Sequence, residues 1–288
     1  METTDPYFRY WGKAMPAAAS GDRYHLLAYH SLDVAACGEL LVTFPHYSLK
    51  PLADDLDWSH AQVNAVFVFF LALHDLGKFA RAFQGLVPHM SSALVTPDQR
   101  KRYDRRHDTL GWLLWYQVLS EDFPNETLPS PDHEFWAIWI RAVVGHHGKP
   151  PEEVGGGGLL PLEQNDFFLA EDRLAAMQFV AQMTNLLLPA GLADPGHGQL
   201  AILKKHTWRL AGLSVLSDWL GSNQAFFAYR STPTPPQQYL QTARECAQRV
   251  VTESGLASHP VRMWTDALEL FDYLRVPTTA RIQIAQNS

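Results

Sequence analysis

The chain has 288 residues, enough for one large domain or for one domain with a smaller appendage. Hydrophobic residues make up 47% and charged residues 18%, a balance that excludes a disordered chain and predicts a sizeable core. The formal net charge of −7 argues against nucleic acid as a partner of the whole surface, but local basic patches can still bind it.

No segment predicts a membrane or secreted protein. The strongest apolar run, Ala65 to Leu73, covers nine residues, whereas a membrane-spanning helix needs about 20. The first five residues are polar and acidic, unlike a secretory signal. Cys37 and Cys246 lie far apart, match no zinc or redox spacing, and allow a disulfide without implying one. We therefore expect a cytoplasmic protein with no membrane partner.

Helical periodicity dominates the first half of the chain. Apolar residues recur at spacings of three and four over 25–44, and Pro45 ends that segment. Asp57 or Ser59 is expected to cap a second helix that runs to His74. Further helices are expected over 79–86 and 107–120.

The second half is also predicted to be helical, with breaks at glycine and proline. A loop is required at 145–151, which reads GHHGKPP, and at the four glycines 155–158. No stretch of alternating β-branched residues predicts a strand. The expected helices cover 133–144, 166–188, 200–220, about 237–254 and about 261–274. These patterns predict an all-α fold.

The pair His74–Asp75 is the strongest chemical signal in the sequence. It follows directly on the apolar run, where an imidazole and a carboxylate are costly to bury unless they pair or bind a metal. Neighbouring helix residues point about 100° apart, so the pair can supply two ligands only at a helix end or kink, and Gly77 fits that requirement. A bridging aspartate can also bind two metals at once, which an isolated histidine cannot.

Four further elements are candidate ligands. His146–His147 lies between two glycines where a predicted helix ends, and adjacent neutral imidazoles suit transition metals. His30 and Asp218 lie inside apolar helices, and His107 begins one. A single helix histidine or aspartate is more often a hydrogen-bonded core residue, so these three gain weight only as members of an ordered set.

A basic run lies immediately before His107. Five of its seven residues are basic: Arg100, Lys101, Arg102, Arg105 and Arg106. Such a run would draw a nucleic-acid backbone towards His107, and the binding would weaken with salt. A solvated charged loop without a partner explains the same residues.

The order of these elements resembles a known family. The motifs His74-Asp-Leu-Gly-Lys-Phe79, Gly145-His-His-Gly-Lys-Pro150 and Ser217-Asp-Trp-Leu-Gly-Ser222 are similar to those of the HD superfamily of metal-dependent phosphohydrolases. Tyr10-Trp-Gly-Lys13 and the segment around His30 narrow the resemblance to the HD nuclease domain of the type I CRISPR-associated helicase-nuclease, closest to the I-E branch. The similarity spans about residues 8–225.

The resemblance implies a fold and a set of residue roles. The fold is an HD-domain helical bundle with a buried metal site over residues 1–230, followed by a helical extension and a linker or tail over 231–288. One metal would be held by His30, His74, Asp75 and Asp218, and a second by Asp75, His107, His146 and His147. Two divalent metal ions are expected. Mn, Fe, Co or Ni would suit these ligands, and Mg is also compatible. No organic cofactor is expected.

The catalytic residues implied are Asp75, as the bridge between the metals, and Lys78, which would meet the scissile phosphate as a point charge. An exposed lysine at a helix end is the alternative for Lys78. Tyr29 and Asp33 lie beside His30 in the sequence and are expected to support the ligands, whereas Trp219 is expected to pack in the core.

Three functions are compatible with these residues. The first is a metal-dependent nuclease acting on single-stranded DNA in type I CRISPR interference, with an RNA-guided surveillance complex and a helicase domain, in cis or in trans, as partners. The second is a nucleotide or cyclic-nucleotide phosphohydrolase, which would be indifferent to changes in residues 100–106. The third is a docking module recruited to an RNA-guided complex, with a silent metal site.

Overall fold

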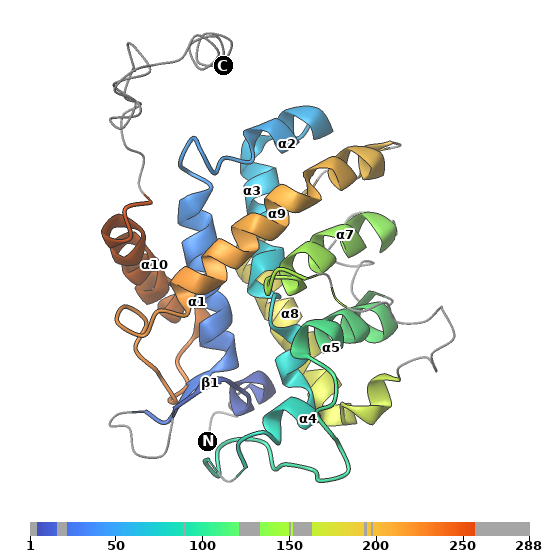
Figure 1. The fold of residues 1–288 in the computed structure, drawn as a ribbon, viewed down its shortest axis with the longest axis vertical. Coiled ribbons are helices and arrows are strands. Elements are labelled where there is room, and N and C mark those ends of the chain that lie inside the picture. Colours follow the sequence, from blue (N-terminus) through green and yellow to red (C-terminus); the bar gives the residue numbers. More distant parts are fainter. Residues whose placement is uncertain are drawn as a thin grey trace, which may run out of the picture. The chain divides into compact units, whose positions relative to one another are not determined.

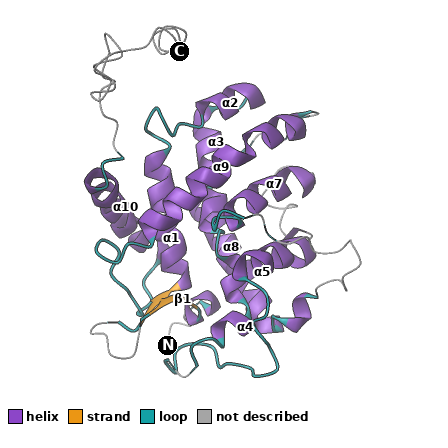
Figure 2. Cartoon of the chain, in the orientation of Figure 1, coloured by secondary structure: helices purple, strands orange, loops and turns teal. Residues whose placement is uncertain are grey.

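Helices make up almost all the regular structure of the chain in this computed structural model (Figure 2). The structure describes residues 5–15, 22–88, 90–120, 133–149, 151, 163–192, 195–196 and 198–256. All of them belong to one compact unit, residues 1–256. The loop predicted at 155–158 and the helix predicted over 261–274 lie outside the described residues.

Two buried helices form the centre of the bundle. Helices α1 (Leu27–Leu41) and α3 (His60–Ala72) are apolar on nearly all sides, as expected for helices enclosed by others. The Ser59 hydroxyl accepts a hydrogen bond from the backbone N–H of Gln62, which makes Ser59 the N-cap of α3. Asp57, the other predicted cap, instead ends α2 (Lys50–Leu56) in a left-handed conformation.

Two long helices pack against α1. Helix α9 (Gln199–Gly221) crosses it obliquely, and α10 (Pro236–Glu253) lies along its other side (Figure 1). The α9 crossing requires Gly221, because a Cβ atom there would lie 2.8 Å from the backbone nitrogen of Val34. This close approach brings the last turns of α9 to the middle of α1.

The remaining elements surround α3 and its C-terminal end. Helix α7 (His133–Val144) lies between α9 and α5 (His107–Leu114), and α5 continues as a π-helical turn, Trp115–Leu119. Helix α8 (Ala170–Leu187) packs on α3 from another side. The shorter helical segments are Pro6–Arg9, Leu76–Phe79, α4 (Arg81–Gln84) and Gln164–Asp166.

Three predictions about local structure are wrong. Strands β1 (Trp11–Ala14) and β2 (Tyr24–Leu26) form an antiparallel pair, although no strand was expected. Their residues are mainly aromatic, small or charged rather than alternating β-branched, so the usual strand signal is missing. Consequently α1 begins at Leu27, and His25 belongs to β2. The sequence also gave no indication of α2.

The prediction that Trp219 packs in the core is also wrong. Its side chain is 70% exposed on α9 and does not pack in the core. The cysteines Cys37 and Cys246 are both free thiols. Among the described helices none is long and apolar enough by itself to cross a membrane; one pair, Lys50–Leu56 with His60–Phe79, passes on length and composition but is bent by 112°.

Candidate metal centre

The centre is built where α3 ends. His74 and Asp75 lie between the last turn of α3 and the 3-10 helix Leu76–Phe79, so both side chains can turn inwards. Gly77 brings this turn directly onto the start of α5, because a Cβ atom at Gly77 would lie 1.8 Å from the carbonyl oxygen of His107. The glycine that follows the His–Asp pair therefore sets the approach of His107.

One half of the centre gathers around Asp75 Oδ2. This oxygen lies 3.2 Å from His30 Nε2 and 3.3 Å from His74 Nε2. Asp218 Oδ1, from α9, lies 3.5 Å and 3.8 Å from the same two nitrogens. We call these four side chains the closed half, because all of them are buried.

The other half faces Asp75 Oδ1. This oxygen lies 3.4 Å from His107 Nε2 and 3.8 Å from His146 Nε2. His147 Nε2 lies 2.9 Å from His107 Nε2, and the His147 side chain is exposed. We call these three imidazoles, together with Asp75 Oδ1, the open half. The structure thus brings all seven predicted ligand residues together, with the two Asp75 oxygens facing different groups.

Backbone carbonyls orient two of the imidazoles. His74 Nδ1 lies 2.9 Å from the carbonyl oxygen of Leu71, and His146 Nδ1 lies 3.0 Å from that of Val143. A carbonyl oxygen can only accept, so each Nδ1 carries the proton and donates it. Each Nε2 therefore presents its lone pair to the centre, which is the state that binds a metal.

Several polar atoms at the centre have no hydrogen bond. His30 Nε2, His74 Nε2 and both oxygens of Asp75 are buried without a hydrogen-bond partner. Leaving a buried polar atom unsatisfied costs about 1–3 kcal/mol. Imidazole nitrogens and carboxylate oxygens are the donors that divalent transition metals prefer. The residues present therefore fit a divalent metal site.

The charge states fit the same site. Burial alone would raise the pKa of Asp75, but Lys78 and His74 outweigh it and hold that pKa well below its usual value. Burial lowers the pKa of His30 to about 4 and that of His107 to about 3. At neutral pH the centre therefore combines an ionised Asp75 carboxylate with neutral imidazoles at His30 and His107.

Lys78 contacts the centre through Asp75. Its Nζ lies 2.6 Å from Asp75 Oδ2 and donates a hydrogen bond of 3.1 Å to the carbonyl oxygen of Gly12. The residue is only 5% exposed, so the alternative of an exposed helix-end lysine is wrong. Its predicted contact with the scissile phosphate stays a prediction.

Two nearby residues have no role assigned from the sequence. The Tyr103 hydroxyl accepts a hydrogen bond of 2.9 Å from the backbone N–H of His107 and lies 3.2 Å from its Nδ1. Lys13 follows Gly12 in β1; burial lowers its pKa, and Asp218 and Asp75 act on it in the opposite sense. The signals were present, because Tyr103 lies four residues before His107 and Lys13 closes the Tyr10-Trp-Gly-Lys13 motif.

Tyr29 and Asp33 bond away from the centre, contrary to expectation. The Tyr29 hydroxyl lies 2.8 Å from the Thr234 hydroxyl. Asp33 accepts a hydrogen bond from the Tyr239 hydroxyl and lies 2.8 Å from His25 Nε2. Both side chains therefore join α1 to the segment around α10.

Most of the basic run is engaged locally. Arg100 pairs with Asp98 at 2.7 Å, and Arg106 with Asp108 at 2.9 Å. Lys101 donates to the carbonyl oxygen of Asn165 and Arg105 to that of Asp104. Arg102 is exposed. The run lies beside His107 as expected, and its binding to nucleic acid stays a prediction.

A buried set of histidines and aspartates inside a helical bundle defines a domain of the HD type. The family model described as "Cas3, HD domain" matches residues 11–227, and the chain belongs to this family. All seven candidate ligands lie within the matched residues.

The curated relative and two solved structures extend this finding. The CRISPR-associated endonuclease/helicase Cas3 of Escherichia coli (strain K12) is 31% identical over 280 residues, which cover 87% of this chain and 30% of that protein. The Thermus thermophilus cas3 HD domain, crystallised in the presence of Ni2+, is 22% identical with a TM-score of 0.55, over 85% of this chain and 92% of that one. A chain of a CRISPR RNA-guided surveillance complex, pre-nicking, is 19% identical with a TM-score of 0.65, over 86% and 29%. The chain thus spans about a third of the curated relative's length.

Proposed function

We propose that this chain is a divalent-metal-dependent nuclease domain that hydrolyses phosphodiester bonds of single-stranded DNA in type I CRISPR interference. One observation carries the proposal. The two oxygens of Asp75 face two separate groups of imidazoles; Oδ1 has no hydrogen bond, and Oδ2 has Lys78 as its counter-charge. A carboxylate in that position suits a bridge between two cations better than a structural role.

The ligand roles follow from the two halves. His30, His74 and Asp218 would hold one ion with Asp75 Oδ2, and His107, His146 and His147 would hold another with Asp75 Oδ1. Mn, Fe, Co or Ni fit this donor set, and the relative crystallised with Ni2+ supports a transition metal. Bound ions would supply Lewis acidity and lower the pKa of coordinated water.

The chain's own cations have complementary tasks. Lys78 offsets the buried charge of Asp75, which keeps the carboxylate ionised and ready to bind cations. The phosphate contact predicted for Lys78 would require Nζ to leave Asp75. Arg102 and Arg106, beside His107, would contact the DNA backbone from the open side. Hydrolysis is expected at the open half, because His147 is the exposed ligand.

The partners are proposed from the relatives. The Escherichia coli relative is an endonuclease/helicase, so a helicase domain is expected to act with this domain in cis or in trans. The structural relative in an RNA-guided surveillance complex supports recruitment to such a complex. Recruitment is compatible with catalysis, because the complete ligand set argues against a silent metal site.

The test combines metal analysis with cleavage of linear and circular single-stranded DNA. The protein should bind divalent metal and cut both substrates, and Asp75→Asn should lose cleavage by more than about 100-fold, the upper range for a group that only supports a ligand. Asp55→Asn is the matched control, because Asp55 also lies 2.7 Å from a histidine, His206, but at the surface. It should keep both properties.

Two results would overturn the proposal. One is unchanged cleavage by Asp75→Asn. The other is turnover of small nucleotides or cyclic nucleotides with single-stranded DNA left intact, which would establish the alternative phosphohydrolase.

A further inference from the structure

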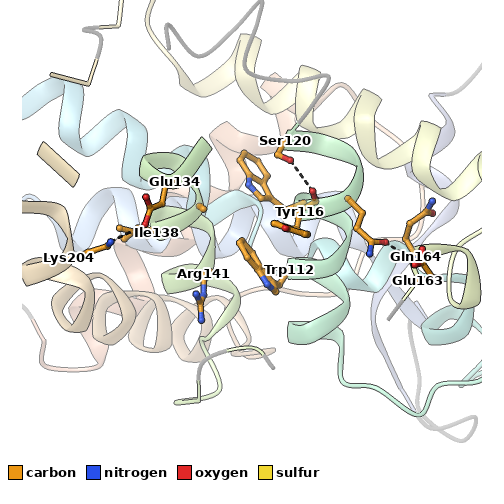
Figure 3. Close-up of a pocket in the computed structure, with 12 residues that line it drawn as sticks. Trp112, Tyr116, Ser120, Glu134, Ile138, Arg141, Glu163, Gln164 and Lys204 are labelled. Carbon is orange, nitrogen blue, oxygen red and sulfur yellow. Dashed lines mark hydrogen bonds and ion pairs between the residues drawn. The ribbon is translucent and has the colours of Figure 1, made fainter. Parts of the chain in front are cut away.

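A groove of about 540 Å³ lies between α7 and α9. Its floor is apolar, with Ile138 and Ala142 from α7 and Ala211 and Val215 from α9. A second depression, of about 900 Å³, lies on the other side of α7 and shares Ile138, Arg141 and Lys204 with the first. Figure 3 shows this second depression, with Arg141 beside Trp112 and Lys204 beside Glu134.

Both walls of the α7–α9 groove belong to segments that also carry candidate ligands of the metal centre. On α9, Val215 and Ala211 precede Asp218 by three and seven residues, so all three lie on one face of the helix. On the other wall, Gly145 and Gly148 line the groove and flank His146–His147. A ligand that left the groove past Gly145 and Gly148 would therefore meet His147, the exposed residue of the open half.

The groove combines an exposed aromatic ring with positive charge. Trp208 lines it and is 84% exposed, which is unusual for so large an apolar side chain. Arg141 and the exposed Lys149 add two cations, and the Arg141 guanidinium lies 5.3 Å from the centre of the Trp112 ring. Lys204 contributes less, since it pairs with Glu134 at 3.0 Å. This positive group stands out in a chain of net charge −7.

We propose that the α7–α9 groove is the track along which a single polynucleotide strand approaches the metal centre, with an unpaired base stacked on Trp208 and phosphates contacting Arg141 and Lys149. The proposal rests on the nuclease function proposed above. An aromatic platform flanked by cations binds a single strand without sequence preference, because every base has a flat face. An apolar protein segment would not need the two cations or the junction with the metal ligands.

The spacing sets the length of strand involved. Trp208 lies ten residues before Asp218 on α9, which corresponds to about 15 Å along the helix axis. At roughly 3.4 Å per stacking step, this distance spans about four steps, so a strand needs about five nucleotides to reach from Trp208 to the level of Asp218. Strands shorter than that should not sense Trp208 while they occupy the metal centre.

The test measures equilibrium binding of fluorescein-labelled oligothymidine, 4 and 12 nucleotides long, to the chelator-treated protein, so that nothing is cleaved. Trp208→Ala should weaken binding of the 12-mer by about 5- to 150-fold, as loss of one stacked base predicts, and change the 4-mer far less. Trp208→Phe should restore most of the affinity. Leu174→Ala is the matched control, because Leu174 is an exposed apolar residue on α8, and it should bind as the wild type does.

The roles of Arg141 and Lys149 are tested by the salt dependence of binding. Arg141→Gln and Lys149→Gln should each reduce the slope of log affinity against log salt by about 0.7. Since Trp208 is almost fully exposed, its replacement should leave the thermal midpoint and the bound metal unchanged, which separates loss of the track from misfolding. Unchanged 12-mer binding by Trp208→Ala would overturn the track and leave the groove to a protein partner. Failure of the nuclease proposal shows separately, as unchanged cleavage by Asp75→Asn.

Discussion

Helix α1 contributes to two buried polar clusters, which differ in how far their polar atoms are hydrogen-bonded within the protein. In the first, His25 Nδ1 accepts from the backbone N–H of Arg230, Nε2 lies 2.8 Å from Asp33, and the Tyr239 hydroxyl donates to Asp33 at 2.9 Å. In the second, His30 and Asp75 lie 3.2 Å apart with buried atoms that have no hydrogen bond. Asp33 follows His30 by only three positions in α1.

The difference distinguishes a structural cluster from a binding cluster. Burial raises the pKa of Asp33, but hydrogen bonds from His25 and Tyr239 oppose that rise and satisfy the carboxylate within the protein. Asp75 Oδ2 has a counter-charge in Lys78, but Oδ1 has no hydrogen bond, so part of the cost of burying the carboxylate remains unless a cation binds. Several ionisable side chains that are buried together with unsatisfied atoms thus point to the candidate metal site, whereas buried histidine and aspartate alone do not.

The largest effect is expected when the hydrogen-bonded cluster around Asp33 is broken. Asp33→Ala leaves the His25 and Tyr239 donors without an acceptor and should lower the free energy of unfolding by about 3–5 kcal/mol, equally with and without metal. Denaturant titration of both forms measures it. Glu39→Ala is the control, because Glu39 and Arg244 join α1 to α10 through an exposed pair worth about 1 kcal/mol or less. A loss seen only in the metal-bound protein would contradict the structural role of Asp33.

The second largest effect is expected when a divalent metal binds the cluster around Asp75. Divalent metal at 100 times its dissociation constant should raise the free energy of unfolding by about 2.7 kcal/mol, because it binds the folded state and supplies the missing partners. Thermal unfolding with Mn2+ or Ni2+ against a chelator measures the shift. His74→Ala should abolish most of it, and the surface variant Asp55→Asn should retain it. An equal shift in His74→Ala would place the metal elsewhere.

That four of the candidate ligands lie together could be predicted because their signal is local. His74–Asp75 at the end of an apolar run and His146–His147 between glycines each place paired ligands at a helix end, and the structure has both helices ending there. His30 and Asp218 were weaker candidates individually. They gained weight from the order of the motifs, and the crossing of α9 over α1 brings them together.

The remaining features depend on contacts distant in the sequence. The strand pair of Trp11–Ala14 with Tyr24–Leu26 is too short and too aromatic to show a strand pattern. The exposure of Trp219 follows from where α9 meets α7 and α1, which helical periodicity does not specify. The α7–α9 groove likewise exists only after both helices have packed, so Trp208 gave no signal in the sequence.

The smallest expected effect concerns Tyr103, which contacts His107 of the open half through hydrogen bonds. The Tyr103 hydroxyl holds His107 through its backbone N–H and its Nδ1, much as carbonyls hold His74 and His146. In Tyr103→Phe the Nδ1 loses this partner, so the ring is no longer held with Nε2 towards Asp75. Metal affinity of the open half should fall by about 10- to 100-fold.

Calorimetric metal titration tests this change, because weakening of one of two binding steps indicates positioning of His107, whereas a structural defect would weaken both. Tyr229→Phe, which loses a surface hydrogen bond with Gln224, is the control and should titrate like the wild type. If Tyr103→Phe also titrates like the wild type, His107 is held by the packing of α5 against Gly77 rather than by the hydroxyl. If both metal-binding steps are unchanged, His107 needs no hydrogen bond from Tyr103 to keep its position. If one step is weakened, the open half depends on Tyr103 for metal binding, whereas the Asp33 cluster is satisfied by hydrogen bonds within the protein.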